Sequence, residues 1–336
     1  MRTDRPTAAD RVRVAWFVLL VVGSGCATAE RVVAPSPAVE VTTAPDPERP
    51  ERWFGAIEDD EGQQTRWTIA EDGGQPEVVG TYSRAPIDPG TEGGGYVTDV
   101  AFDQERDVAF VGLCCEPVSG SVFGLDLADP DVFEPVEQGT QVDVLSGDEA
   151  FARSDSSGSV FIRSAVVRPE RLLDGEARGA SVALSSDGGT LHVAVLVDPR
   201  RLSQFELPPG EAAEPELIVY TSREGAWTPR TFALDEQPRF CGVAFVAPDR
   251  VGLLRLDDVS EPSSRCVGSQ VDVYDLEQEE LRAGVIEFAE PVQHVSADDA
   301  SAYLIYTSVS GKVGWRSTSD GGSGELADGG FVGADW

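Results

Sequence analysis

Apolar and polar positions alternate in short runs along most of this chain. Runs such as "VFGLDL", "SVFIRSAVV", "ELIVYTS" and "QVDVYDL" either have the period of two expected of β-strands or are continuously apolar, and clusters of Gly, Asp, Pro and Ser separate them. Beyond the amino-terminal segment, no stretch shows helical periodicity over more than two turns. The pattern therefore predicts an all-β protein.

One unit of this pattern recurs, consisting of a valine in a short strand, a polar turn and an apolar strand. The steps between its five copies are 42, 40, 61 and 52 residues when they are aligned on Val100, Val142, Val182, Val243 and Val295. The first two steps have the length of one propeller blade, and the longer two contain hydrophilic insertions at 208–216 and 256–269. Counting back one unit from the first copy reaches Trp53, which predicts a six-bladed β-propeller, with seven blades as the alternative.

One copy of the unit carries a resemblance to a known family. The segment "LSSDGGTLHVAVL", residues 184–196, resembles the WD40-like repeat of TolB-type β-propellers, in which an apolar-Ser-x-Asp-Gly turn precedes a strand. The resemblance implies that Asp187, Gly188 and Gly189 make the tight turn between the two inner strands of a blade. It covers about a dozen residues per blade and implies structure only.

The end of the chain is rich in glycine and aspartate. "STSDGGSGEL", residues 317–326, resembles the front half of the Asp-box hairpin of sialidase-like propellers, but the tryptophan that closes that hairpin is absent. We therefore predict a propeller over 53–317 and a flexible Gly/Asp-rich tail over 318–336.

The amino terminus has the layout of a signal peptide over 1–25. Two arginines precede the nine-residue apolar run Val14–Val22, which is too short to span a bilayer as a helix. The small residues before Cys26 resemble a bacterial lipobox, which implies a lipid on that thiol; an ordinary secretory signal cleaved near Ala27 or Ala29 is the alternative. Residues 26–52, rich in Pro, Ala, Glu and Thr, predict an extended tether.

The formal charge of −33 limits the partners. It excludes nucleic-acid binding, because phosphate backbones need Lys and Arg to displace their counterions. It also argues against docking on anionic lipid, so the membrane attachment is assigned to the lipid anchor. We expect a monomer held on the outer face of a bacterial cell membrane, with an envelope protein or a glycan as its unknown partner.

Four cysteines remain if Cys26 is acylated, and an exported chain favours disulfides, for which four thiols allow three pairings. Cys241 and Cys266 belong to one predicted blade and are expected to pair. That leaves the adjacent Cys114 and Cys115, for which we predict a vicinal disulfide in a distorted strand end, with a redox pair as the alternative. A thiol metal site usually has spaced Cys or His pairs, and the sequence contains none.

No catalytic residue is predicted. His192 and His294 lie in predicted strands of different blades, and none of the usual hydrolase, metalloprotease or phosphate-binding motifs occurs. Paired carboxylates such as Asp298-Asp299 are expected to form solvated turns. No cofactor is expected; Ca²⁺ is compatible with the many acidic residues, but no particular ligand set is assigned.

The predicted function is a non-catalytic binding or interaction module. The innermost strands read "VAF", "VDV", "VAL", "VAF" and "VSA", which favours a packed, apolar centre. The insertions 208–216 and 256–269 are the expected contact surface, with Trp227 and Phe205 flanking the first. The alternative is a glycan-directed hydrolase or lyase that uses carboxylates in the propeller funnel.

Overall fold

The computed structural model separates the chain into two units, Met1–Asp46 and Pro47–Trp336. The residues described are 49–58, 64–71, 74–83, 96–114, 120–129, 133–146, 150–154, 159–164, 170–173, 180–197, 215–223, 225–234, 238–257 and 266–336. The predicted signal peptide, Cys26 and most of the tether lie outside them. Within the described part, no helix has the length and apolar character needed to cross a membrane.

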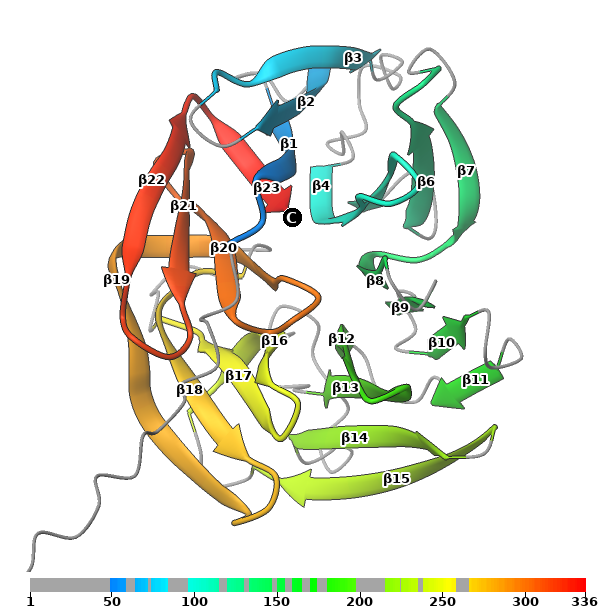
Figure 1. The fold of residues 1–336 in the computed structure, drawn as a ribbon, viewed down its shortest axis with the longest axis vertical. Coiled ribbons are helices and arrows are strands. Elements are labelled where there is room, and N and C mark those ends of the chain that lie inside the picture. The colour runs from blue at the N-terminus through cyan, green and yellow to red at the C-terminus, as the bar shows by residue number, and fades with distance from the viewer. Residues whose placement is uncertain are drawn as a thin grey trace, which may run out of the picture. The chain divides into compact units, whose positions relative to one another are not determined.

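The described secondary structure consists of β-strands (Figure 1). The first seven are β1 (Arg52–Glu58), β2 (Gln64–Glu71), β3 (Glu77–Ser83), β4 (Tyr96–Asp103), β5 (Val108–Cys114), β6 (Ser121–Asp126) and β7 (Phe133–Gln138). The next eight are β8 (Gln141–Leu145), β9 (Ala150–Ser154), β10 (Val160–Arg163), β11 (Glu170–Leu173), β12 (Ala180–Asp187), β13 (Thr190–Val197), β14 (Glu216–Arg223) and β15 (Ala226–Ala233). The last eight are β16 (Phe240–Ala247), β17 (Arg250–Arg255), β18 (Gly268–Asp275), β19 (Glu280–Ala297), β20 (Tyr303–Ser308), β21 (Lys312–Ser317), β22 (Ser323–Asp328) and β23 (Phe331–Asp335).

These strands form antiparallel four-stranded units that we call blades and number along the chain. Blade 1 is β23-β1-β2-β3, blade 2 is β4–β7, blade 3 is β8–β11 and blade 4 is β12–β15. A seven-stranded sheet makes blades 5 and 6, because the early part of β19 pairs with β18 and Val292–Ala297 pairs with β20. The predicted all-β propeller is confirmed, and the five aligned valines all lie in the first, innermost strands.

The prediction of a flexible tail at 318–336 is wrong. Ser323–Asp328 forms the outer strand of blade 6, and Phe331–Asp335 pairs with β1 as the innermost strand of blade 1. Glycine-rich composition indicated a tail, but here Gly329 and Gly330, both at positive φ, provide the turn between these two strands. The last strand thus closes the ring against the first.

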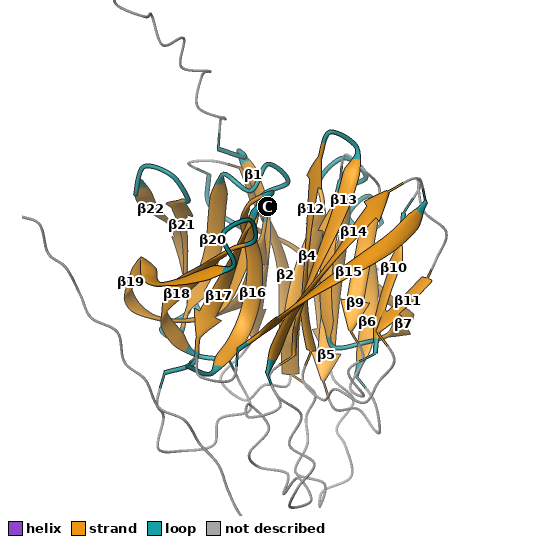
Figure 2. Cartoon of the chain, turned by 90° about the horizontal axis from the view of Figure 1, so that it is seen from below, coloured by secondary structure: helices purple, strands orange, loops and turns teal. Residues whose placement is uncertain are grey.

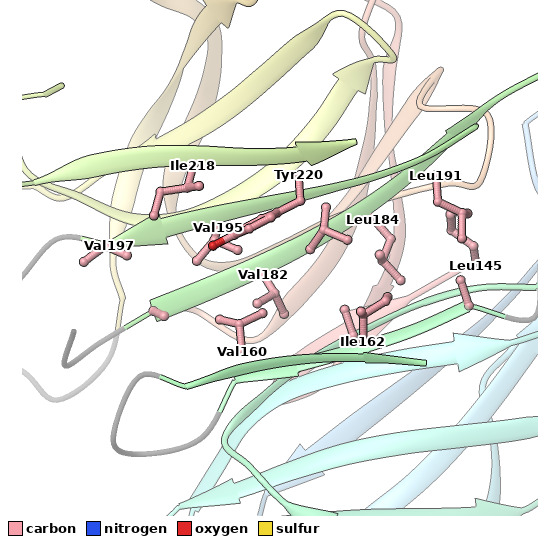
Figure 3. Close-up of a cluster of buried hydrophobic side chains, with 14 residues drawn as sticks. Leu145, Val160, Ile162, Val182, Leu184, Leu191, Val195, Val197, Ile218 and Tyr220 are labelled. Atoms are coloured by element: carbon pink, nitrogen blue, oxygen red, sulfur yellow. The ribbon is translucent and has the colours of Figure 1, made fainter. Parts of the chain in front are cut away.

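Each junction between neighbouring blades contains one cluster of buried apolar side chains within the described residues. Figure 3 shows the junction of blades 3 and 4, where Val160 and Ile162 face Val182 and Leu184. The intervening Ala183 belongs to the cluster shared with blade 5. Since successive side chains of a strand point to opposite faces, inner strands must be apolar on both, which explains their nearly continuous apolar runs.

Antiparallel pairing gives the ring two different faces (Figure 2). On the turn face, first strands join second strands and third strands join fourth, through short turns such as Gly188-Gly189. On the loop face, second strands join third strands and each blade joins the next. The three longest connections within the propeller unit, 84–95, 198–215 and 256–267, all begin and end on the loop face.

Candidate functional site

Three consecutive inner strands use an aspartate to bond to the next blade. Asp335 Oδ2 accepts the Phe102 N–H at 2.7 Å, which joins blade 1 to blade 2. Asp99 Oδ2 accepts the Val142 N–H at 2.9 Å, which joins blades 2 and 3. Asp143 Oδ2 accepts the Leu184 N–H at 2.6 Å, which joins blades 3 and 4. Each carboxylate thus satisfies a backbone donor that the sheet ladder leaves unpaired.

In Asp99 and Asp143, the second carboxylate oxygen accepts a backbone N–H from the same strand. Asp99 Oδ1 accepts the Val100 N–H at 3.1 Å, and Asp143 Oδ1 accepts the Val144 N–H at 2.9 Å. Buried carboxylates are tolerated only where such donors replace the lost water. In both cases an Asp of the inner strand is followed by a large apolar residue in the sequence. Asp335 is likewise followed by Trp336.

A histidine of blade 6 reaches one of these aspartates across blade 1. His294 Nε2 donates to Asp99 Oδ1 at 2.8 Å, with the two side chains only 7% and 13% exposed. Gly333 of β23 lies beside this pair, and a Cβ there would be 2.7 Å from Val100 Cγ2 and 3.9 Å from His294 Cδ2. Because blades 6 and 2 are not neighbours, the contact places the pair at the centre of the ring.

Burial dominates the electrostatics of this axial cluster, by which we mean Asp99, Asp143, Asp335 and His294. Desolvation raises the pKa of Asp335 to about 7, against hydrogen bonds to its carboxylate and the nearby His294. Burial also raises the pKa of Asp143 well above its usual value, and the charges of Asp335 and Asp99 raise it further. Asp143 keeps some exposed area, so its burial is less complete than that of Asp335.

The turn between β19 and β20 closes the axis on the turn face. Asp299 Oδ2 accepts the Ser146 N–H of blade 3 at 3.2 Å, and the hydroxyls of Ser301 and Ser185, in blades 6 and 4, lie 3.3 Å apart. Asp298 accepts the backbone N–H groups of Ala302 and Tyr303, each at 2.7 Å, and is buried. Burial raises the pKa of Asp298. The turn therefore contacts the far side of the ring.

Two expectations are corrected by this geometry. Asp298 does not belong to a solvated turn, because its carboxylate is buried and organises the turn that crosses the axis. The innermost strands are not an apolar core at the axis, where their inward side chains include the axial cluster and Ser185. The sequence signal was the recurrence of an Asp before an apolar residue in the inner strands, which could have been noticed at Asp99 and Asp143.

On the loop face, a disulfide and hydrogen bonds fix the two ends of the connection 256–267. Cys241, in the innermost strand of blade 5, forms a disulfide with Cys266, with 5.3 Å between their Cα atoms, which confirms the predicted pair. The Asp257 N–H donates to the Val267 carbonyl at 2.9 Å, and Ser269 Oγ donates to Asp257 Oδ1 at 2.9 Å. Both ends of the connection are therefore held beside the inner strand.

The remaining predicted site residues are placed as follows. Gly188 and Gly189 form the two-residue turn after Asp187 with φ of 55° and 81°, the geometry of a type I′ hairpin. Trp227 is partly buried and packs against the cluster between blades 3 and 4. His192 lies in β13, where its Nδ1 is 3.2 Å from Thr221 Oγ1, and burial lowers its pKa.

Other predictions fall outside the described residues. These are Phe205, Cys115, and most of both insertions. Cys114 ends β5, but its side chain is also outside the description, so the vicinal disulfide stays a prediction. In the described part, no three His, Cys, Asp or Glu side chains are grouped so that they could hold a metal ion. The Ca²⁺ prediction remains untested.

Comparisons with known proteins agree with the propeller architecture. No family model matches the chain, and no curated protein matches it. Among solved structures, the chain is similar to the crystal structure of TolB from Acinetobacter baumannii, with 12% sequence identity and a TM-score of 0.54. The match covers 85% of this chain and 66% of the TolB chain, slightly under two thirds of that protein. At this identity the similarity shows the fold alone: the chain has a TolB-like β-propeller.

Proposed function

We propose that this chain is an exported, lipid-anchored protein of the bacterial envelope whose propeller is a non-catalytic binding module, and that its loop face contacts the partner. The main support is that a disulfide and hydrogen bonds hold the two described ends of the 256–267 connection in fixed positions. Fixed ends reduce the conformational entropy that a loop loses when it binds.

The two faces of the ring differ in a way that supports this choice. The turn face is closed at its centre by the β19–β20 turn, and its connections are short. The chain also enters β1 on that face, where the guanidinium of Arg49 lies over the rings of Trp315 and Trp336 at 5.0 and 5.8 Å. The loop face, on the opposite side from the start of β1, is therefore the surface that we propose for the partner.

The axial carboxylates support a binding module over a glycan-cleaving enzyme. Glycosidases need one carboxyl group to donate a proton and a second to act as base or nucleophile on the same bond. In this ring, both oxygens of Asp99 and Asp143 already accept backbone N–H groups that hold blades together. Moving these oxygens to a substrate would break the contacts that position the strands.

The loop-face proposal is tested by site-specific photo-crosslinking in cells. A crosslinker at position 263, in the 256–267 connection, is compared with one at Asp320, an exposed residue of the turn face. We expect one discrete adduct from position 263 and none from position 320. The adduct should disappear when 258–265 is replaced by a short Gly-Ser turn that retains Cys266. Equal adducts from both positions, or an adduct that survives the replacement, would refute the assignment of the contact to this loop.

The anchor is tested by the intact mass of the protein from the membrane fraction. A diacylglycerol-sized increment at Cys26, and release of the Cys26→Ser variant into the soluble fraction, are the expected results. An unlipidated wild-type mass would refute the anchor and leave the loop-face experiment interpretable.

A further inference from the structure

We propose that the axial cluster of Asp99, Asp143, Asp335 and His294 is a proton-binding site that makes the closure of the ring sensitive to pH. Its four side chains come from blades 1, 2, 3 and 6, and three of them bond one blade to the next. A change in their ionisation therefore acts on several blade junctions at once. This inference is independent of the proposed function.

The axial cluster contains more acidic groups than basic ones. The cluster has three carboxyl groups and one imidazole, and the inner strands β4, β8, β12, β16 and β23, together with Val292–Ala297, contain no Lys or Arg. Like charges that interact in a site of low dielectric constant raise one another's pKa, as Asp335 and Asp99 do for Asp143, so the cluster favours retention of a proton.

Asp335 is buried at the closure of the ring. This side chain is 3% exposed; Oδ2 accepts the Phe102 N–H, and no donor meets Oδ1 with hydrogen-bond geometry. The Ser296 hydroxyl and the Trp336 N–H favour the ionised form, but burial outweighs them and raises the pKa of Asp335. An ionised, buried Oδ1 without a donor is costly, but a protonated Oδ1 is neutral and can donate. His294 Nδ1 is likewise buried and without a hydrogen-bond partner. The cluster therefore contains polar atoms that could still bind a proton or form a hydrogen bond.

The other titratable groups near Asp335 are engaged elsewhere. Strands β1, β20 and β21 also pack against β23. In β1, Arg52 pairs with Asp107, and Glu58 accepts the Val97 N–H. In β21, Lys312 pairs with Glu325, while Arg316 acts electrostatically on Tyr306 of β20. Tyr303 of β20 packs edge-on against Trp315. The charges that act on Asp335 are those of Asp143 in β8 and His294 in β19.

The direction of the pH effect follows from linkage. The pKa of Asp335 is raised from 3.8 to about 7 in the folded protein, so the folded state holds this proton more tightly than the unfolded state. The stabilisation is fully present at low pH and is lost as the pH rises toward 7. Between pH 5.5 and 8.5, this single group should raise the unfolding equilibrium constant roughly 30-fold. Above pH 7, the contribution of Asp335 to the stability of the closed ring is at its lowest.

The experiment is urea unfolding of the purified protein between pH 5.5 and 8.5, for wild type, Asp335→Asn and Asp320→Asn. Asn at 335 keeps an oxygen for the Phe102 N–H, supplies N–H donors in place of Oδ1, and does not titrate. Asp320 is exposed, so its variant removes one charge from the general repulsion of an acidic chain without touching the axis. We expect the fall in stability between these pH values to shrink in Asp335→Asn and to persist in Asp320→Asn.

A carboxyl ¹³C titration of the wild type provides a second measurement that does not depend on whether a variant folds. An aspartate resonance with a midpoint near 7, absent from Asp335→Asn if that variant folds, is expected. Equal pH dependence of wild type and Asp335→Asn would overturn the proposal. Titration of every aspartate below pH 5 in the wild type would overturn it as well.

Discussion

The junction of blades 4 and 5 and the junction of blades 2 and 3 join the same kinds of strand by different chemistry. Between blades 4 and 5 lies a large, mainly apolar cluster that includes Phe232, Phe245 and Tyr274, and Ser181 Oγ donates to the Cys241 carbonyl across the same junction. Between blades 2 and 3 the apolar cluster is small, and the Asp99 carboxylate also bonds the two inner strands. Apolar contacts are non-directional, whereas a carboxylate bonded to a particular N–H specifies which residues lie opposite each other.

The two kinds of blade junction are also expected to respond differently to pH. An apolar junction depends on shape and buried area, which protons do not change. A junction joined by a buried carboxylate depends on the ionisation of that group. The junctions of blades 1 and 2 and of blades 3 and 4, which Asp335 and Asp143 bond, are thus expected to respond to pH, while the junctions from blade 4 to blade 6 respond to packing.

The largest expected effect is from truncation in the apolar half. Phe245 is fully buried between blades 4 and 5, so Phe245→Ala should reduce the free energy of unfolding by about 4 kcal/mol. Urea denaturation at pH 5.5 and pH 8.5 should show nearly the same loss at both. A loss that differs strongly between the two pH values would mean that the apolar junction is coupled to the axial cluster, contrary to the comparison.

A smaller effect is expected in the carboxylate half. Asp99→Ala leaves the Val142 N–H and His294 Nε2 without their acceptor, which should cost about 2 to 3 kcal/mol. Asp99→Asn retains one oxygen acceptor and serves as the matched control, with a smaller expected loss. Chemical denaturation measures both. If the two variants were equally stable, the hydrogen bonds of Asp99 would contribute little to the junction.

The smallest expected effect is at Gly333, which lies beside His294 and Val100. Gly333→Ala places a methyl group 2.7 Å from Val100 Cγ2, which β23 or β4 must move to accept, at a cost of about 1 to 2 kcal/mol. We expect a measurable fall in the thermal midpoint and a changed imidazole resonance of His294. Alanine at an inner-strand position away from the axial cluster, Ser186→Ala in β12, controls for general effects. An unchanged His294 resonance in Gly333→Ala would show that this glycine is not needed for the pair.

Local patterns were sufficient for the strands and for most of the blade order. Alternating or continuous apolar runs and turn residues are short-range features, so the aligned valines are enough to identify five inner strands. The Asp187-Gly188-Gly189 turn and the Cys241–Cys266 pair are also local, since both lie within a single blade. Composition alone was misleading at 318–336, where glycine-rich sequence forms two strands.

The sequence by itself determined the strands, the repeat and the acidic character of this protein, because each depends on neighbouring residues or on composition. Only the tertiary structure decided which side chains meet at the axis. Asp335 is 233 residues from Phe102 in the chain, and His294 is 195 residues from Asp99. These contacts exist only after the last strand pairs with the first, and no local pattern encodes the distance between residues that ring closure brings together.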